Sequence, residues 1–201
     1  MQTTPLPSLD WNALCAEQLD WHWHQQLRPR LEGLTDEEYR WEPVPGAWNV
    51  RPRGTSTAPI AAGGGDFTID FATPEPDPPP FTTIAWRIGH LVVGVLGARV
   101  ATHFGGPPID YATHDYPGDA AGALAQLDQA YSAWIAGVRG LGPDGLRRPC
   151  GPGEGPWASH PMAGLVMHIN REVLHHGAEV ALLRDLYLWG GHGDQAGHGA
   201  A

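Results

Sequence analysis

One segment near the C-terminal end of the sequence carries four side chains of types that ligate metal ions. His168, Glu172, His175 and Glu179 follow one another at spacings of four, three and four residues. At 100° per residue of an α-helix, they share a stripe about 60° wide. Because imidazole nitrogens and carboxylate oxygens bind divalent metals, the stripe indicates either a metal site or a solvated, hydrogen-bonded face. The neighbouring His176 falls instead on the apolar stripe of the same helix.

Another candidate ligand, His90, ends the motif Trp86-Arg-Ile-Gly-His90. It falls near the apolar helix face marked by Ile84, Ile88 and Leu91, so we expect its side chain to point inward. A single inward histidine is commonly structural. Where such a histidine meets a stripe of histidine and glutamate on another helix, the two helices together can supply three protein ligands and an open position. This is the arrangement of catalytic zinc sites.

The elements that must position these residues are helices. Apolar periodicity predicts four long helices, over about residues 9–34, 82–104, 119–141 and 161–189. Asp119 is a predicted N-cap, and Pro161 suits the first position of the last helix. The predicted fold class is therefore all-α, a four-helix bundle.

A long connection interrupts this pattern between the first two long helices. Residues 43–80 are rich in Pro, Gly, Thr and Ser, which predicts an insertion or a functional flap. Within it, residues 66–71 alternate in polarity and favour a short strand. We predict one domain over residues 1–189 and a disordered tail over residues 190–201, which are rich in Gly and His.

Composition excludes several functions. All 12 cationic residues are arginine, so a lysine Schiff base and a phosphate-binding Walker A lysine are both excluded. A net charge of −10 argues against nucleic-acid binding. The longest apolar stretch, residues 91–98, is too short to span a membrane, and no signal peptide is visible. We expect a cytoplasmic protein in which Cys15 and Cys150 are reduced thiols.

Two segments carry a resemblance to a known family. Trp86-Arg-Ile-Gly-His90-Leu, and Asn170-Arg-Glu-Val-Leu-His-His-Gly177 followed by Ala181-Leu-Leu-Arg184, resemble the DinB-like four-helix superfamily. This superfamily includes mycothiol-dependent thiol transferase or isomerase-like proteins of bacteria. The resemblance covers about residues 9–189, apart from the insertion and the tail.

The resemblance implies a divalent metal, zinc or nickel, held by three histidines. His90 matches the first, and His175 matches the second member of an H-x-x-x-H pair on the last helix. The first member of that pair falls on Arg171, whose guanidinium cannot ligate a metal. Either Glu172 or His168 replaces it, or the metal has been lost.

The function implied is metal-dependent thiol chemistry, of the thiol transferase or isomerase kind, on a small electrophilic substrate. The thiol would be mycothiol or a similar low-molecular-weight thiol. The insertion and loops would wall the cavity, with some of Trp41, Trp48, Trp86 and Trp157 lining it. The alternative is a non-catalytic DinB-like protein with a vestigial metal site, which binds a small molecule or forms a homodimer.

Overall fold

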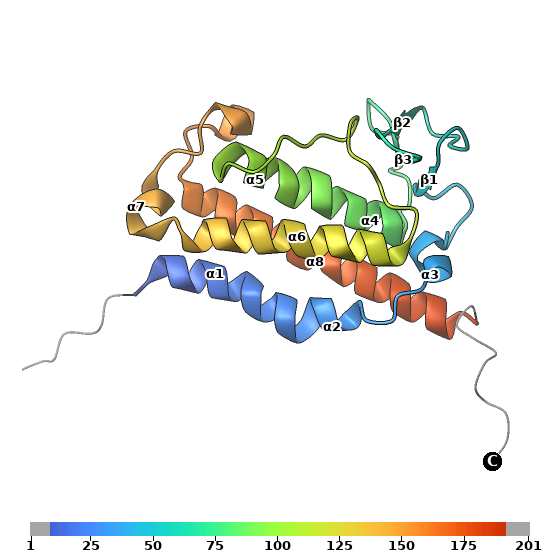
Figure 1. Ribbon diagram of the computed structural model, residues 1–201, viewed down its shortest axis with the longest axis horizontal. Coiled ribbons are helices and arrows are strands. Elements are labelled where there is room, and N and C mark those ends of the chain that lie inside the picture. Colours follow the sequence, from blue (N-terminus) through green and yellow to red (C-terminus); the bar gives the residue numbers. More distant parts are fainter. Residues whose placement is uncertain (1–8, 192–201) are drawn as a thin grey trace, which may run out of the picture.

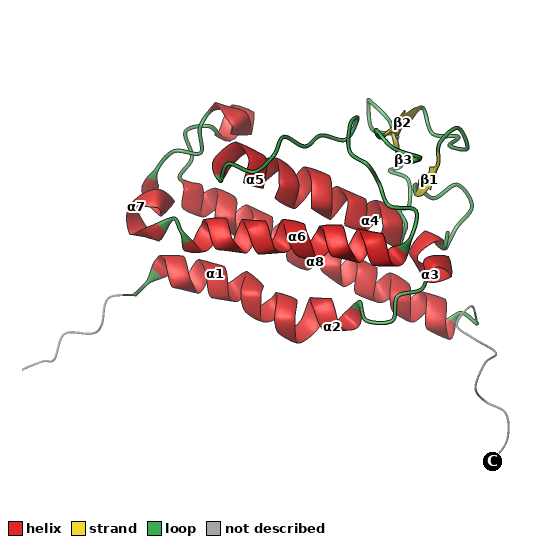
Figure 2. Ribbon diagram, in the orientation of Figure 1, coloured by secondary structure: helices red, strands yellow, loops and turns green. Residues whose placement is uncertain are grey.

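The computed structural model describes residues 9–191, and this part of the chain is mostly helical (Figures 1 and 2). Long helical segments pack side by side along the longest axis of the molecule, and short helices lie at its ends. The helices are α1 (Trp11–His22), α2 (Arg28–Arg30), α3 (Asp36–Arg40), α4 (Ile84–His90), α5 (Ala98–His103), α6 (Ala120–Arg139), α7 (Gly142–Arg147) and α8 (Met162–Trp189). The π-helical turns η1 (Trp23–Leu27) and η2 (Leu91–Gly97) join α1 to α2 and α4 to α5, and η3 (Pro152–Trp157) is a 3₁₀ helix.

Side-chain caps fix where several of these helices begin. The side chain of Asp10 accepts a hydrogen bond from a backbone N–H of the first turn of α1, and that of Thr83 does the same for α4. Asp119 caps α6 as predicted, with its Oδ1 2.7 Å from the backbone nitrogen of Gly122. Each cap satisfies a donor that the helix itself leaves without a partner.

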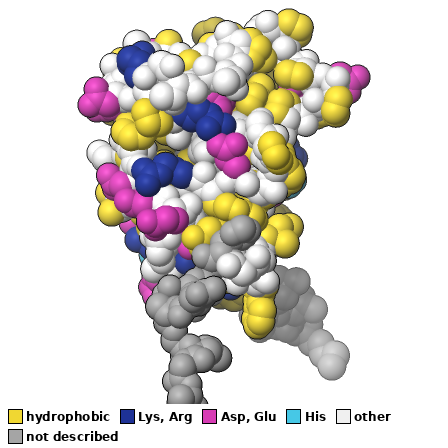
Figure 3. Space-filling model, turned by 90° about the vertical axis from the view of Figure 1, so that its right-hand side faces the viewer, with side chains coloured by type: hydrophobic (Ala, Val, Ile, Leu, Met, Phe, Trp, Pro, Cys, Tyr) yellow, Lys and Arg dark blue, Asp and Glu magenta, His cyan; other side chains and the backbone are white. Residues whose placement is uncertain are grey.

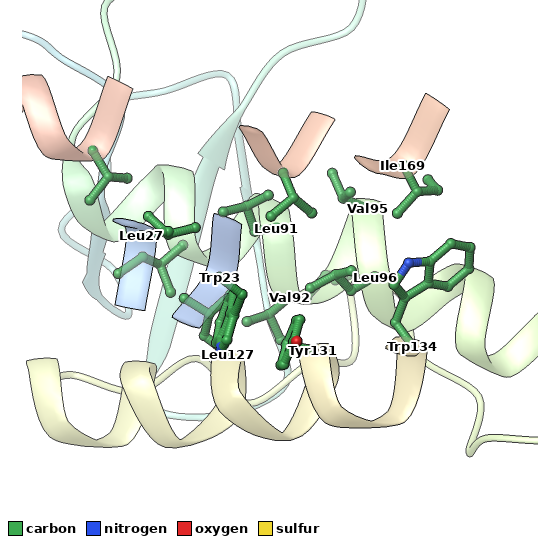
Figure 4. Close-up of a cluster of buried hydrophobic side chains, with 14 of the residues drawn as sticks. Trp23, Leu27, Leu91, Val92, Val95, Leu96, Leu127, Tyr131, Trp134 and Ile169 are labelled. Atoms are coloured by element: carbon green, nitrogen blue, oxygen red, sulfur yellow. The ribbon is translucent and has the colours of Figure 1, made fainter. Parts of the chain in front are cut away.

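The core lies between the long helical segments (Figure 4). Trp23 of η1 stacks on Tyr131 of α6 with ring centroids 3.9 Å apart and planes within 3° of parallel. Trp134, one turn further along α6, is fully buried. The first segment and α8 approach closely at Gly177, where an added Cβ would lie 2.8 Å from a methyl group of Leu27. Any larger residue at Gly177 would therefore require the side chain of Leu27 or one of the two helices to shift.

The insertion folds into a three-stranded antiparallel sheet, which corrects the all-α prediction. Its strands are β1 (Val50–Pro52), β2 (Ile60–Ala62) and β3 (Phe67–Phe71), in the order β1-β3-β2. The predicted strand is the central one, and its Ile69 is fully buried. The indole nitrogen of Trp86 donates to the backbone oxygen of Asp70 at 2.8 Å, so the sheet is attached to α4. A buried apolar residue and this attachment explain why the insertion is ordered.

The end of the molecule that carries the sheet shows arginine and carboxylate side chains next to one another (Figure 3). Arg51 lies 2.6 Å from Glu42 and 2.8 Å from Asp70, and Arg30 lies 2.5 Å from Asp185. These arginines therefore neutralise carboxylates of the same chain.

The segment from α4 to α5, residues 84–103, is long and apolar enough to cross a membrane by length and composition. In the structure, 61% of its most apolar window is buried inside the protein. Most of its apolar side chains are thus used in the core. Residues 192–201 of the predicted tail lie outside the described residues, and the single domain over residues 1–189 stays a prediction.

Candidate metal site between α4 and α8

Two histidines from different helices meet at the interface of α4 and α8. The rings of His90 and His176 lie 4.9 Å apart between centroids, with their planes at 86°. His176 is 8% exposed, and His90 is partly buried at the end of α4. His176 points into the protein and toward His90 because it lies on the apolar stripe of α8.

Two carboxylates of α8 flank His176, one on each side. Nε2 of His176 lies 3.6 Å from Oε2 of Glu172, and Nδ1 lies 2.7 Å from Oε2 of Glu179. Two ligands of a tetrahedral zinc ion are roughly 3.4 Å apart, given metal–ligand bonds of about 2.0–2.2 Å. Nε2 of His176 and Oε2 of Glu172 are therefore at the distance expected of two ligands of one ion. The Glu179 pair is a hydrogen bond of the kind that orients a ligating imidazole.

A tyrosine from the loop between α5 and α6 orients the other histidine. The hydroxyl of Tyr111 lies 2.6 Å from Nδ1 of His90. Burial raises the pKa of Tyr111 to about 12, so the phenol keeps its proton at neutral pH. When Nδ1–H donates to the phenol oxygen, the hydrogen bond fixes the ring and leaves the lone pair of Nε2 for a metal. The indole of Trp86 stacks on the same imidazole, with centroids 5.3 Å apart.

The electrostatics of the site keep His90 neutral. Burial, together with the nearby positive charges of His176, Arg87 and Arg99, lowers its pKa to about 4. A neutral imidazole is the form that binds a metal, because its free lone pair is the ligand. At pH 7 this histidine is therefore already in the ligating form.

Arg87 of α4 occupies one side of the site. Its Nη1 lies 3.0 Å from Oε2 of Glu179 and 3.2 Å from Nδ1 of His176. Burial lowers the pKa of Arg87 and the charge of Glu179 raises it, and the guanidinium remains charged. Because Arg87 already neutralises Glu179, this carboxylate is better suited to orienting His176 than to binding a metal.

The predicted ligands His175 and His168 lie at the edges of this cluster. The side chain of His175 is 63% exposed and lies 3.4 Å from Oε1 of Glu179. Ligand atoms of His175, His176 and Glu179 lie within 4.8 Å of one another, so they form an outer cluster that could also hold a metal ion. His168 lies two turns away, with Nδ1 2.6 Å from a nitrogen of Arg171 and 3.4 Å from Oε1 of Glu172.

The structure therefore joins His90 and Glu172 through His176, a residue that the polar stripe did not contain. Glu172 and His176 are four residues apart, which is the spacing that the resemblance attributes to the two ligands of the last helix. The register differs by one residue from that of Arg171 and His175. Arg171, whose side chain is 70% exposed, does not enter the site. The sequence signal that could have identified His176 is its place on the apolar stripe.

The protein is thus largely helical, and the cluster of histidine and glutamate between two of its helices has side chains that could hold a divalent metal. The model of the DinB superfamily matches residues 18–180, and the chain belongs to this superfamily. The matched segment includes every residue of the cluster. No curated protein and no solved structure matches the chain.

Proposed function

We propose that the protein binds a divalent metal through His90, Glu172 and His176, and that it is an enzyme of thiol chemistry on a small electrophile. The observation that carries the proposal is the meeting of His90 and His176, at 4.9 Å, beside the carboxylate of Glu172. Two imidazoles and one carboxylate form a ligand set of the kind found in catalytic zinc sites, which keep an open position. Nitrogen and oxygen donors suit zinc or nickel.

The remaining side chains of the site hold the ligands in place. Tyr111 fixes the ring of His90, and Glu179 fixes that of His176. Arg87 holds Glu179 in turn. When bound, a divalent metal would lower the pKa of a coordinated thiol or water. The chain itself supplies the orientation of the ligands and a partly buried site.

The reacting thiol is proposed to come from a separate molecule. Burial raises the pKa of Cys150 and also that of Cys15, so neither favours its thiolate form. A low-molecular-weight thiol such as mycothiol fits the family to which the chain belongs. The reaction would join this thiol to an electrophile, with the leaving group and the thiol proton released.

The metal proposal is tested by metal analysis of untagged protein purified without chelator and then loaded with zinc or nickel. We expect about one ion per chain, lost in His90→Ala and in His176→Ala and kept in His175→Ala as the matched control. Circular dichroism verifies that the variants are folded. If His175→Ala loses the ion and His90→Ala keeps it, the outer cluster is the site. Thiol chemistry is then tested by measuring the rate at which mycothiol reacts with chlorodinitrobenzene in the presence of the zinc-loaded protein. A rate no higher than in buffer alone contradicts the proposed thiol chemistry.

A second candidate function is dimerisation without catalysis. Trp11 and Leu14 of α1 and Met167 of α8 are exposed large apolar residues along one cavity of about 700 Å³. An apolar surface of this kind is typical of an interface. We propose a homodimer through this face, tested by light scattering of the wild type and Trp11→Glu. A monomeric wild type contradicts it.

A further inference from the structure

A second cavity lies further toward the N-terminal end of α8, and the mechanism above does not use it. It has a volume of about 390 Å³, within the range of small-molecule pockets. Its wall comes from α5, η3, the loops around η3 and the first turns of α8. The polar lining residues are Arg99, Glu154, His160, His168 and Arg171. The apolar lining residues are Cys150, Trp157, Gly164 and Leu165.

The charge of this lining favours an anion. Its one carboxylate, Glu154, is already held by Nε2 of His103 at 2.9 Å and by Arg99 at 3.3 Å. Nε of Arg99 is buried and has no hydrogen-bond partner among the described residues. Arg171 adds a second guanidinium, most of which is exposed. The lining thus has two guanidiniums and one carboxylate, which leaves a positive charge at this cavity of a chain with net charge −10, and guanidinium matches the geometry of a carboxylate.

The apolar part of the lining favours a flat, non-polar body on the ligand. The indole of Trp157 is 62% exposed, and its ring packs edge to face against His160 with centroids 4.9 Å apart. Leu165 contributes a mostly buried aliphatic wall. An aromatic ring would remove part of the exposed indole from water, which stabilises binding.

The cavity is connected to the metal site through Glu172. One oxygen of Glu172 lies 3.7 Å from Nε of Arg171, a lining residue, and the other lies 3.6 Å from His176. His168, which also lines the cavity, lies 3.4 Å from the same carboxylate. A ligand whose carboxylate is held by Arg171 would therefore have that end beside Glu172, which connects the cavity to the His90 and His176 cluster.

We propose that this cavity binds a small aromatic carboxylate, with the carboxylate between Arg99 and Arg171 and the ring against Trp157. As the substrate pocket of the enzyme, it rests on the proposed function. As a carboxylate site, it depends only on its own lining and is tested without metal.

The experiment compares benzoate with its neutral analogue benzamide on metal-free full-length protein, by ligand-detected NMR and calorimetry. A Cβ added at Gly164 of α8 would meet no atom within 4 Å, so Gly164→Leu fills the cavity without disturbing the helix. Arg171→Gln removes one guanidinium from a largely exposed side chain. Arg147→Gln, at an exposed arginine of α7, is the matched control.

We expect benzoate to bind at least about tenfold more tightly than benzamide, since the neutral amide cannot make charged hydrogen bonds to both guanidiniums. Gly164→Leu and Arg171→Gln should each weaken benzoate binding by about tenfold, while Arg147→Gln leaves it unchanged. Equal binding of benzoate and benzamide, or full binding to Gly164→Leu, overturns the proposal. If the protein binds metal but not benzoate, the proposed carboxylate site is refuted and the metal site stands. If it binds benzoate but not metal, only the proposed metal site is refuted.

Discussion

Tyr111 reaches His90 because residue 94 has no side chain. The phenol oxygen lies 2.6 Å from Nδ1 of His90, and an added Cβ at Gly94 would lie 1.9 Å from that oxygen. The glycine in the π-helical turn η2 thus leaves room for Tyr111, a loop residue, to reach the ring of His90 and orient it. The orientation of His90 therefore depends on both the helix and the loop.

Gly94→Ala should therefore weaken metal binding without removing a ligand. The methyl group displaces the Tyr111 hydroxyl and frees the ring of His90, and loss of such a supporting partner lowers metal affinity about 10- to 100-fold. Zinc titration against a competing chelator measures the effect. Tyr111→Phe is the matched control, because it removes only the hydroxyl. If Tyr111→Phe binds zinc as tightly as the wild type, the hydroxyl does not support the metal.

Glu172 and Glu179 should differ in their effect on the metal. Glu172 faces Nε2 of His176 at ligand spacing, whereas Glu179 is hydrogen-bonded to Nδ1 and paired with Arg87. We expect Glu172→Gln to abolish zinc binding and Glu179→Gln to weaken it only about tenfold. Calorimetric titration of both variants measures this order. The reverse order would place the ion in the outer cluster with His175.

Stability of the metal-free protein should fall in mild acid because of His90. Its pKa is about 4 in the folded protein and 6.5 in the unfolded chain, so the unfolded chain binds the proton more readily. The contribution is fully present above pH 6.5 and is lost as the pH falls from 6.5 toward 4. The free energy of unfolding should drop by roughly 2–3 kcal/mol between pH 7.5 and 4.5 from this group.

Urea unfolding of the wild type and His90→Gln at the two pH values isolates that contribution. Other groups titrate in both proteins, so only the difference between their pH dependences belongs to His90. We expect His90→Gln to lose less stability on acidification. Parallel curves for the two proteins would show that His90 is accessible to protons in the folded state.

The sequence predicted the helices better than the site. Apolar periodicity located the long helical segments to within a few residues, because burial of one face imposes that periodicity. The polar stripe of α8 was less informative, since a rotation of 100° separates His175 on the surface from His176 in the interior. The family resemblance is confirmed by the match over residues 18–180.

The contacts that complete the site were not visible in the sequence. Tyr111 comes from a loop, and no periodicity relates it to His90. The pairing of Arg87 with Glu179 joins residues of different helices across a distance of many residues in the chain. The sheet followed from alternation only in its central strand, because its edge strands are three residues long.

Asp70 should be important for stability because it joins the sheet to its surroundings. Its buried carboxylate accepts hydrogen bonds from the backbone of Asn49 at 3.0 Å, from Arg51 at 2.8 Å and from Ser56 at 2.5 Å. In Asp70→Asn the NH₂ of the amide replaces one carboxylate oxygen and faces at least one of these donors. That donor then loses its acceptor. We expect the free energy of unfolding to fall by about 1–3 kcal/mol.

Thermal and urea unfolding of Asp70→Asn measure this effect, with Glu42→Gln as the control. Glu42 also pairs with Arg51, but its side chain is 30% exposed, so water replaces the lost interaction and the change should be under about 1 kcal/mol. Because Trp86 donates to the backbone of residue 70, a loosened sheet should also disturb the indole that stacks on His90. Asp70→Asn should therefore weaken zinc binding as well. Unchanged zinc affinity in a destabilised Asp70→Asn protein would show that the sheet stabilises the fold without supporting the site.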